Sequence, residues 1–368
     1  MTDTTAPRRL PRARHEHILR ELELRGSVRA AAVAEQLGVT EVTIRRDIID
    51  LEKAGRLARV HGGAISLAAA PRPQPARSLA GLVLPTSTGS HYPDFVRGAE
   101  AASPALRARV VLASSHYRGA AERKHVERLI ELGVEGLMIA PTLRDQTVDD
   151  IAASLQDVTV PVVLVERRLD DSTRLAQYDW IRTDHARGAM LAVEHLARLG
   201  HASVGLALLD RTPTAPSIRE GHARAVEHLR LAPAPLQPLP KDEGEPDLAD
   251  AALEAFLDDC LANGTRAVLV HTDYHASRLV EIAVDRGVRV PEDLAIVAYD
   301  DENAELAIVP LTAVSPPGRE LGRLALQTLF ERVRSDDPAA IPPRHVQLVP
   351  RLTIRRSCGA PATVSRSA

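Results

Sequence analysis

Apolar residues recur with helical spacing near the start of the chain. Ile18, Leu19 and Leu22 fall on one stripe of a segment that ends at Gly26, and this spacing predicts an amphipathic helix. A shorter alanine-rich segment, AAAVAEQL, follows and ends at Gly38. Because glycine readily adopts the left-handed conformation that closes a helix, two helices are expected before residue 40.

A third helix is expected immediately afterwards. Thr40 is a residue type that caps helix N-termini, and Ile44, Ile48 and Leu51 recur at positions i, i+4 and i+7 before Gly55. These three residues share one face of a helix, so that face is expected to contact a core.

Two short β-prone runs then flank Gly62 and Gly63 in the sequence RLARVHGGAISL. Paired glycines between such runs indicate a β-hairpin. Helix, helix, tight turn, helix and hairpin is the order of a winged helix-turn-helix, which is the first domain that the pattern predicts.

The pattern changes from residue 79 onward, where short apolar runs alternate with amphipathic segments. AGLVLP precedes DFVRGAEAA, for example, and GLMIAP precedes TVDDIAASL. Repeated strand–helix units predict a parallel sheet covered by helices on both faces. This part is longer than one core usually allows, so two lobes are expected. The predicted fold class is α/β, with an N-terminal winged helix-turn-helix and a two-lobed domain built on parallel sheets.

These patterns divide the chain into four segments. They are a winged helix-turn-helix at 1–67, a proline-rich linker at 68–79, a two-lobed domain at 80–356 and a flexible polar tail at 357–368. Within the third segment, lobe 1 is expected to comprise about 80–200 and 315–335, and lobe 2 about 201–314 and 340–356.

Charge is distributed unevenly between these parts. The net charge of the 368-residue chain is −3, but residues 1–79 contain 14 basic and 9 acidic side chains, and the remainder has a balance of −8. A basic head on an acidic body favours a polyanion as the partner of the head.

Composition also indicates the compartment. Cys260 and Cys358 are the only cysteines in the sequence, which gives no disulfide framework and suits a reducing environment. No apolar run has the length that spans a bilayer, and the polar, basic start is unlike a signal peptide. A cytoplasmic protein without a membrane partner is expected.

The third helix carries residue types that bind DNA. Thr43, Arg45 and Arg46 lie outside its apolar stripe. In the major groove, arginine binds guanine edges or phosphate, and threonine contacts phosphate or the thymine methyl group. Neighbouring residues point about 100° apart on a helix, so one arginine at most faces the bases directly. The wing adds Arg59 and His61. A solvated, arginine-rich helix face is the alternative interpretation.

The segment LGVTEVTIRRDIIDLEKAGRLARVHGGA resembles the N-terminal signature of DeoR-family regulators, including its TIRRD core and RVHGGA wing. The resemblance implies that Thr40, Thr43, Arg45 and Arg46 lie at double-stranded operator DNA. It also implies that Asp47 is a local partner for an arginine rather than a base reader.

The rest of the chain, roughly 79–356, resembles the periplasmic-binding-protein-like domain of LacI/GalR regulators. Six segments in order carry this resemblance: GLVLPTSTGSHYPDFVRGAE, ERLIELGVEGLMIAP, VPVVLVERRL, TDHARGAMLAVEHLARLGHASVGL, RVPEDLAIVAYDD and VPLTAVSPPGRELGRLAL. It implies a type I periplasmic-binding-protein-like fold and a homodimer or higher homo-oligomer. It also implies a sugar or related metabolite in the crevice between the lobes, at the carboxyl ends of their strands.

Family positions give a set of effector-binding candidates, which are mostly polar side chains near predicted strand ends. They are Thr86, Ser87, Thr88, His91, Tyr92, Trp180, Asp184, Arg219, Asp273 and Asp300. Asp273 and Asp300 are expected to accept hydrogen bonds from sugar hydroxyls, although a strand-end aspartate also commonly caps a helix. Trp180 is expected either to stack on a sugar ring or to pack within its lobe. Asp301 is expected to cap or pair rather than bind.

The sequence departs from the LacI pattern at two positions next to these candidates. Thr272 stands where the family commonly has asparagine, and Ile218 stands where a ligand-binding arginine is usual, with Arg219 one position later. On a helix that displacement rotates the side chain by about 100°, so the family's ligand is not carried over. His271, Asp273 and His275 spell HxDxH, but such residues after a strand need not converge, and no metal site is expected.

The sequence therefore predicts a DNA-binding transcription regulator, a repressor, whose operator binding is controlled by a small polar effector. No cofactor and no catalysis are expected, because a glycine-rich phosphate loop, a Ser/His/Asp order and a metal cluster are all missing from the sequence. Two alternatives stay open. One is a sugar-modifying enzyme with an auxiliary DNA-binding head, and the other is a DNA-binding dimer that senses no effector.

Overall fold

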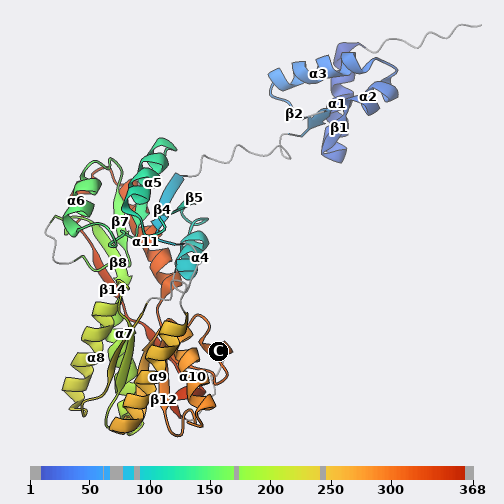
Figure 1. The fold of residues 1–368 in the computed structure, drawn as a ribbon. Helices are drawn as coiled ribbons and strands as arrows, with labels where there is room; N and C mark the ends of the chain where they lie inside the picture. The colour runs from blue at the N-terminus through green and yellow to red at the C-terminus, as the bar shows by residue number, and fades with distance from the viewer. Residues whose placement is uncertain are drawn as a thin grey trace, which may run out of the picture. The chain divides into compact units, whose positions relative to one another are not determined.

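The structure, a computed structural model, describes residues 10–60, 62–66, 78–86, 92–169, 174–240 and 246–360. It forms two compact units, Met1–Ala76 and Arg77–Ala368, which we call the head and the body (Figure 1). No helix of the described ranges combines the length and the apolar character that crossing a membrane requires.

The head has the predicted winged helix-turn-helix order. Its described elements are α1 (Pro11–Arg25), β1 (Ser27–Arg29), α2 (Ala30–Leu37), α3 (Glu41–Lys53), β2 (Ala58–Val60) and β3 (Gly63–Ile65). β2 and β3 pair in antiparallel register, as the two glycines predicted, and β1, which the sequence pattern did not indicate, pairs with β3 on its other side.

The apolar stripes of α1 and α3 make the core of the head. Its buried members include Ile18, Leu22, Ile44, Ile48 and Leu51. Gly26 and Gly38 end α1 and α2 with φ values of 72° and 64°, a conformation that glycine adopts without steric cost. Helices α1 and α2 therefore end at the glycines that the sequence indicated, whereas α1 begins at Pro11, before its apolar stripe.

The first lobe of the body contains a six-stranded sheet with the strand order β14-β8-β7-β6-β4-β5, and all of its strands run parallel. Its elements are β4 (Ser78–Leu84), α4 (Tyr92–Ala102), β5 (Ala108–Ser114), α5 (Gly119–Glu131), β6 (Gly136–Ile139), α6 (Val148–Gln156), β7 (Val162–Val165), β8 (Asp179–Thr183), α11 (Gly318–Val333), η2 (Pro338–Ala340) and β14 (His345–Leu348).

The second lobe contains another six-stranded sheet, in the order β10-β9-β11-β12-β13-β15, in which only β15 runs antiparallel. Its elements are α7 (His185–Arg198), β9 (Gly205–Leu209), α8 (Ala215–Leu229), β10 (Leu236–Leu239), α9 (Pro246–Asn263), β11 (Ala267–His271), α10 (Asp273–Asp285), β12 (Ala295–Tyr299), η1 (Ala304–Leu306), β13 (Thr312–Ser315), β15 (Arg351–Thr353) and η3 (Arg356–Cys358).

Each sheet is buried on both faces, as the nearly continuous apolar strands predicted. Alternate residues of β4 enter different cores: Leu82 and Leu84 pack with α4 and α11, whereas Val83 packs on the opposite face. In lobe 2, Ile296 and Val297 of β12 divide between two cores in the same way. The predicted α/β architecture with two lobes is therefore present.

The chain crosses between the lobes at three places, which corrects the expected lobe boundaries. The crossings follow β8, β13 and β14, so α11 and β14 return to lobe 1 late in the sequence (Figure 1). Helix α7 was expected in lobe 1, but Ala189, Val193 and Leu196 pack in a core of lobe 2. Strand β14, which was expected in lobe 2, extends the sheet of lobe 1 beside β8.

The C-terminal boundary also differs from the expectation of a flexible tail from residue 357. Ser357 and Cys358 are buried, and Cys358 Sγ accepts a hydrogen bond from Thr312 Oγ1 at 3.0 Å. The chain therefore remains packed on lobe 2 through η3. Most of the expected linker lies outside the described residues, and its last two positions, Ser78 and Leu79, belong to β4.

Candidate functional site

The exposed face of α3 presents the side chains that the sequence selected in the head. Thr40 caps the helix by accepting a hydrogen bond from the Thr43 amide. Arg45 is exposed and pairs with Glu41 one turn earlier, with Nη2 and Oε1 2.6 Å apart. Arg46 is also exposed and has no hydrogen-bond or ion-pair partner among the described residues. The guanidinium of Arg46 is thus available to a ligand, whereas that of Arg45 already has a carboxylate.

Asp47 lies on the opposite face of α3 and is buried. Its carboxylate accepts two hydrogen bonds from Arg14 of α1, from Nε at 2.7 Å and from Nη2 at 3.0 Å, and its Oδ1 lies 3.3 Å from His15 Nε2. A bidentate pair of this kind fixes geometry as well as charge. The prediction that Asp47 is a partner for an arginine is confirmed, and the pair attaches α3 to α1.

A hollow of about 470 Å³ lies between α3 and the wing. Arg45, Arg59, Gly62 and Gly63 are among the residues that line it, and Arg59 Nε is 3.5 Å from Glu52 Oε2. The predicted wing residue His61 lies outside the described residues. Arginines from the helix and from the wing therefore share one concave surface of the head.

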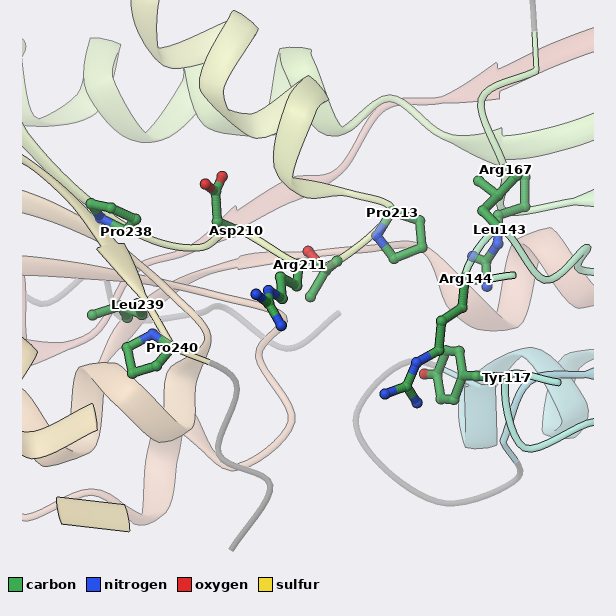
Figure 2. A pocket seen from close by; sticks show the side chains of 11 residues that line it. Tyr117, Leu143, Arg144, Arg167, Asp210, Arg211, Pro213, Pro238, Leu239 and Pro240 are labelled. Carbon is green, nitrogen blue, oxygen red and sulfur yellow. The ribbon is translucent and has the colours of Figure 1, made fainter. Parts of the chain in front are cut away.

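The largest cavity described in the body, of about 870 Å³, lies between the two lobes. Lobe 1 contributes Tyr117, Leu143, Arg144 and Arg167 to its lining. Lobe 2 contributes Asp210, Arg211, Thr212, Pro213, Pro238, Leu239 and Pro240 (Figure 2). These residues follow β5, β6, β7 and β9 or lie at the end of β10. The cavity is thus at the carboxyl ends of parallel strands, where α/β sheets bind ligands.

A smaller cavity of about 210 Å³ shares Arg167 and Pro213 with the first and is lined mainly by polar side chains. Glu166, at the end of β7, accepts hydrogen bonds there from the amide and the hydroxyl of Thr183, at 3.2 and 2.9 Å. His185 Nε2 lies 3.8 Å from Glu166 Oε2. Buried acceptors and donors therefore adjoin the larger cavity.

Asp184 and Arg219 are the sequence-selected residues nearest to these cavities. Asp184 lines the smaller cavity, but its carboxylate also caps α7 by accepting a hydrogen bond from the Arg187 amide at 2.9 Å. Arg219 forms an ion pair with Asp210, a residue of the larger cavity. Both residues therefore stand at the cleft while also serving local structure.

Trp180 lies apart from the larger cavity. It lines a separate hollow of about 200 Å³, where its ring stacks on His345 with centroids 4.8 Å apart. The Arg182 guanidinium covers the ring of Trp180 at 4.1 Å. Packing within lobe 1, one of the two roles left open for Trp180, thus accounts for its contacts.

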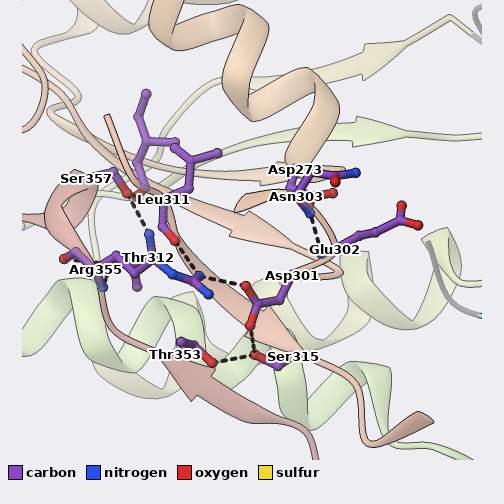
Figure 3. Close-up of polar contacts among 11 residues, drawn as sticks. Asp273, Asp301, Glu302, Asn303, Leu311, Thr312, Ser315, Thr353, Arg355 and Ser357 are labelled. Carbon is purple, nitrogen blue, oxygen red and sulfur yellow. Dashed lines mark hydrogen bonds and ion pairs between the residues drawn. The ribbon is translucent and has the colours of Figure 1, made fainter. Parts of the chain in front are cut away.

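The acidic residues that follow β11 and β12 are engaged within lobe 2 (Figure 3). Asp273 Oδ2 accepts hydrogen bonds from the amides of Glu302 and Asn303 at 2.8 and 2.7 Å, and burial raises the pKa of Asp273. Asp301 pairs with Arg355 at 2.6 Å and accepts a hydrogen bond from Ser315. The expectation that Asp301 pairs is confirmed, and Asp273 holds a loop in place.

Four further candidates do not come together at the cavities. Thr86, Tyr92, Asp273 and Asp300 line none of the three hollows of the body described above. Tyr92 is buried beneath Arg167, 6.0 Å from the guanidinium to the ring centroid, and burial raises its pKa to about 12. Ser87, Thr88 and His91 lie outside the described residues.

None of the eleven residues that line the larger cavity was among the effector-binding candidates predicted from the sequence. Tyr117, Arg144, Arg167 and Arg211 each stand a few positions after a predicted apolar run. A position shortly after a predicted strand was also the sequence feature of the residues that were predicted as effector-binding candidates. The predicted candidates came mainly from the strands that the family pattern indicates, and not from every strand end of both lobes.

Comparison with protein families assigns both units. Residues 14–69 match the DeoR-like helix-turn-helix domain, and residues 193–358 match the periplasmic binding protein-like domain. The chain joins a DeoR-like head to a periplasmic-binding-protein-like body. This combination is the one that the two resemblances in the sequence implied.

Similar proteins include transcription regulators. The arabinose metabolism transcriptional repressor of Geobacillus stearothermophilus is 27% identical over 308 residues, which cover 82% of this chain and 83% of that protein. The CelR–cellobiose complex superimposes with a TM-score of 0.63 at 21% identity, covering 89% of this chain and 98% of that one. The lac repressor dimer bound to operator and an anti-inducer gives a TM-score of 0.63 at 22% identity, with coverages of 80% and 99%.

The sites of the head and of the body can now be placed within these folds. The two solved structures share the fold of the periplasmic-binding-protein-like body, and the curated relative is a transcription regulator. In the DeoR-like head, Arg46, which has no partner among the described residues, stands on α3, the helix that follows the tight turn of the helix-turn-helix. In the body, the largest cavity described opens between the lobes at strand ends.

Proposed function

We propose that this protein is a transcription repressor whose DeoR-like head binds operator DNA and whose body binds a small polar effector between its lobes. The observation that carries the DNA-binding part is the outer face of α3. Thr43 and Arg46 lie there outside the core, and Arg46 has no partner in the part of the chain that the structure describes. A helix after a tight turn, with arginine and threonine on its outer face, fits the major groove.

The interlobe cavity supports the effector part of the proposal. It combines polar and apolar walls contributed by both lobes, so a ligand that contacts both would favour one arrangement of the lobes over others. CelR was solved with cellobiose, and the lac repressor dimer with operator and an anti-inducer. By analogy, this protein acts in the cytoplasm as a homodimer that places two heads on two half-sites, and its effector is sugar-like.

Roles on the DNA follow from the contacts of the head. We assign base reading to Arg46, because its guanidinium has no competing partner among the described residues. We assign phosphate contacts to Thr43, Arg45 and Arg59. Arg45 is already paired with Glu41, and Arg59 of the wing lies near Glu52. The cap residue Thr40 positions the start of α3, and His61 belongs to the same wing surface.

The test is operator binding by the full chain. Duplexes tiled across the DNA upstream of its gene and the neighbouring genes are titrated at several salt concentrations, with unrelated duplex as competitor. Specific binding that weakens as salt rises is expected, since phosphate contacts release counterions. Arg46→Ala is expected to lower operator affinity by about 1–3 kcal/mol.

Arg20→Ala is the matched control, because Arg20 is an exposed arginine on α1 with no partner among the described residues. Its affinity for operator is expected to equal that of the wild type. A chain that shows no salt-sensitive preference for any tiled duplex would contradict the regulator proposal. If Arg46→Ala and Arg20→Ala lowered operator affinity equally, the assignment of base reading to Arg46 would be wrong.

A further inference from the structure

The interlobe cavity presents hydrogen-bond donors where a neutral sugar would require acceptors as well. Three of its eleven lining residues are arginines, and Asp210 is the acidic one. The carboxylate of Asp210 is already paired with Arg219. Ionised carboxylates only accept hydrogen bonds and guanidinium groups only donate them, so the wall of the cavity is rich in donors and positive charge.

Two acidic residues that the sequence selected for the effector site are engaged with backbone groups. Asp273 holds the amides of Glu302 and Asn303, as Figure 3 shows. Asp184 caps α7. These two carboxylates therefore already accept backbone hydrogen bonds, whereas three arginines line the cavity.

The three arginines differ in how much of their charge is available. Arg167 is buried, and its Nε and Nη1 donate to the carbonyls of Pro141 and Glu166, both at 2.8 Å. It is therefore largely fixed by lobe 1. Arg211 is exposed and has no partner among the described residues. Arg144 is exposed on the other lobe, and Figure 2 shows these two side chains approaching the cavity from its two sides.

Two guanidinium groups on opposite walls repel each other and attract an anion placed between them. An anion bound by both would join lobe 1 to lobe 2 by charge-assisted hydrogen bonds. It would thus supply the difference in affinity between open and closed arrangements that any effector-driven shift requires. Pro213, Pro238, Leu239 and Pro240 add an apolar wall to the cavity.

We infer that the effector is an anionic polyhydroxy compound, with its phosphate or carboxylate held between Arg144 and Arg211. Its hydroxyl groups extend toward the smaller cavity, where Glu166, Thr183 and Ser217 lie. This inference rests on the proposed function, since it names the chemical class of the effector for that same site.

The experiment measures ligand binding to the full-length protein by thermal shift and calorimetry. The probes are matched sets of a neutral sugar, its phosphate ester and its sugar acid, with glucose, glucose 6-phosphate and gluconate as one set and the corresponding ribose and fructose compounds as others. Inorganic phosphate serves as the minimal anion. We expect the tightest ligand to be anionic, to bind at least about tenfold more tightly than its neutral counterpart, and to be displaced by inorganic phosphate. The phosphate and acid members of each set distinguish the two kinds of anion.

Arg144→Gln and Arg211→Gln remove one charge from each wall. Each is expected to weaken binding of the anionic ligand by about 10- to 100-fold and to abolish the preference over the neutral sugar. Arg198→Gln, at an exposed arginine of α7 in lobe 2, is the control and is expected to bind as the wild type does. Both cavity arginines are exposed, so thermal melts of the unliganded variants are expected to match the wild type.

Three outcomes would overturn the inference: a neutral sugar that binds as tightly as its anionic counterparts, cavity variants that keep wild-type affinity, or an absence of binding by every anion of the panel. Operator titrations on the same preparations separate this failure from failure of the regulator proposal. If a neutral sugar releases the operator, the regulator proposal holds and only the anionic effector is contradicted. If the protein binds no operator at all, the regulator proposal itself is contradicted.

Discussion

At the scale of single residues, His271 shows how burial makes stability depend on pH. It ends β11 with 3% of its surface exposed, and its ring meets Tyr299 edge-on at 5.8 Å. Burial, aided by the nearby His185 and His275, lowers the pKa of His271 to about 3. The folded protein therefore keeps this imidazole neutral at pH values where the unfolded chain protonates it.

The sign of the effect follows from proton binding. Below the unfolded pKa of about 6.5 the unfolded state binds more protons, so the free energy of unfolding falls as the pH drops and levels off only near the folded pKa. Between pH 7 and pH 5, His271 alone is expected to lower it by about 2 kcal/mol. Urea denaturation of His271→Phe at the two pH values should show a correspondingly smaller drop than the wild type. His228→Gln, at an exposed histidine, should behave as the wild type, and an unchanged drop in His271→Phe would refute this account.

Residue-scale roles were only partly predictable from the sequence. The pairing of Asp47 was implied by the resemblance to the DeoR signature, and capping or pairing was expected for Asp301. Their arginine partners are present in the structure. The role of Asp273 did not follow, because its hydrogen-bond donors are the amides of residues 302 and 303. The end of a predicted strand places a carboxylate at one edge of a parallel sheet. Which loop donates hydrogen bonds to that carboxylate depends on tertiary packing.

At the scale of elements, each lobe contains two helices that approach closely through glycine. A Cβ on Gly322 of α11 would lie 1.9 Å from the Phe95 carbonyl oxygen of α4. A Cβ on Gly221 of α8 would lie 2.0 Å from the Ala186 carbonyl oxygen of α7. Because interiors are close-packed, such contacts leave no space for a methyl group.

Gly221→Ala is therefore expected to destabilise the body, although alanine is the better helix former by about 1 kcal/mol. Overpacking at a backbone contact should lower the free energy of unfolding by about 1–3 kcal/mol, measured by urea denaturation of the full chain. Ala223→Gly, at an exposed position of the same helix, isolates propensity and should cost about 1 kcal/mol. If Gly221→Ala raised stability, propensity rather than the close approach would govern this position.

The order of elements was predictable because the apolar period changes from helical stripes to strand-length runs near residue 79. The assignment of α7 and β14 to lobes was not. The apolar pattern does not indicate the crossings after β8, β13 and β14, because a buried strand has the same run of apolar residues in either sheet. Strand β1 has three residues, too few to display a period, and its pairing with β3 comes from the folded head.

At the scale of the whole molecule, an ion pair between arginine and glutamate joins the two lobes beside the cleft. Arg168 follows β7 in lobe 1, and its Nη1 lies 2.6 Å from Oε2 of Glu220 on α8 in lobe 2. Hydrogen bonding to Arg168 lowers the pKa of Glu220. The pair forms only when the lobes approach as they do in this structure, so it stabilises that arrangement relative to more open ones.

Breaking this pair is expected to weaken effector binding if the effector favours the same arrangement of the lobes. The side chains are 49% and 38% exposed, so solvent screens the interaction and its contribution is about 0.2–1 kcal/mol, which corresponds to an affinity loss of at most about fivefold. Arg168→Gln and Glu220→Gln should each cause this loss for the tightest ligand of the sugar panel, measured by calorimetry at low salt. The double variant should bind nearly as the single variants do, because the contact between Arg168 and Glu220 is already lost in each of them. The longer contact of Glu220 with Arg224, at 3.5 Å, lies within α8 and does not join the lobes. High salt should bring the effector affinity of the wild type close to that of the variants.

If the losses of affinity instead added in the double variant, each side chain would contact the effector on its own. The ion pair would then have no part in closing the cleft.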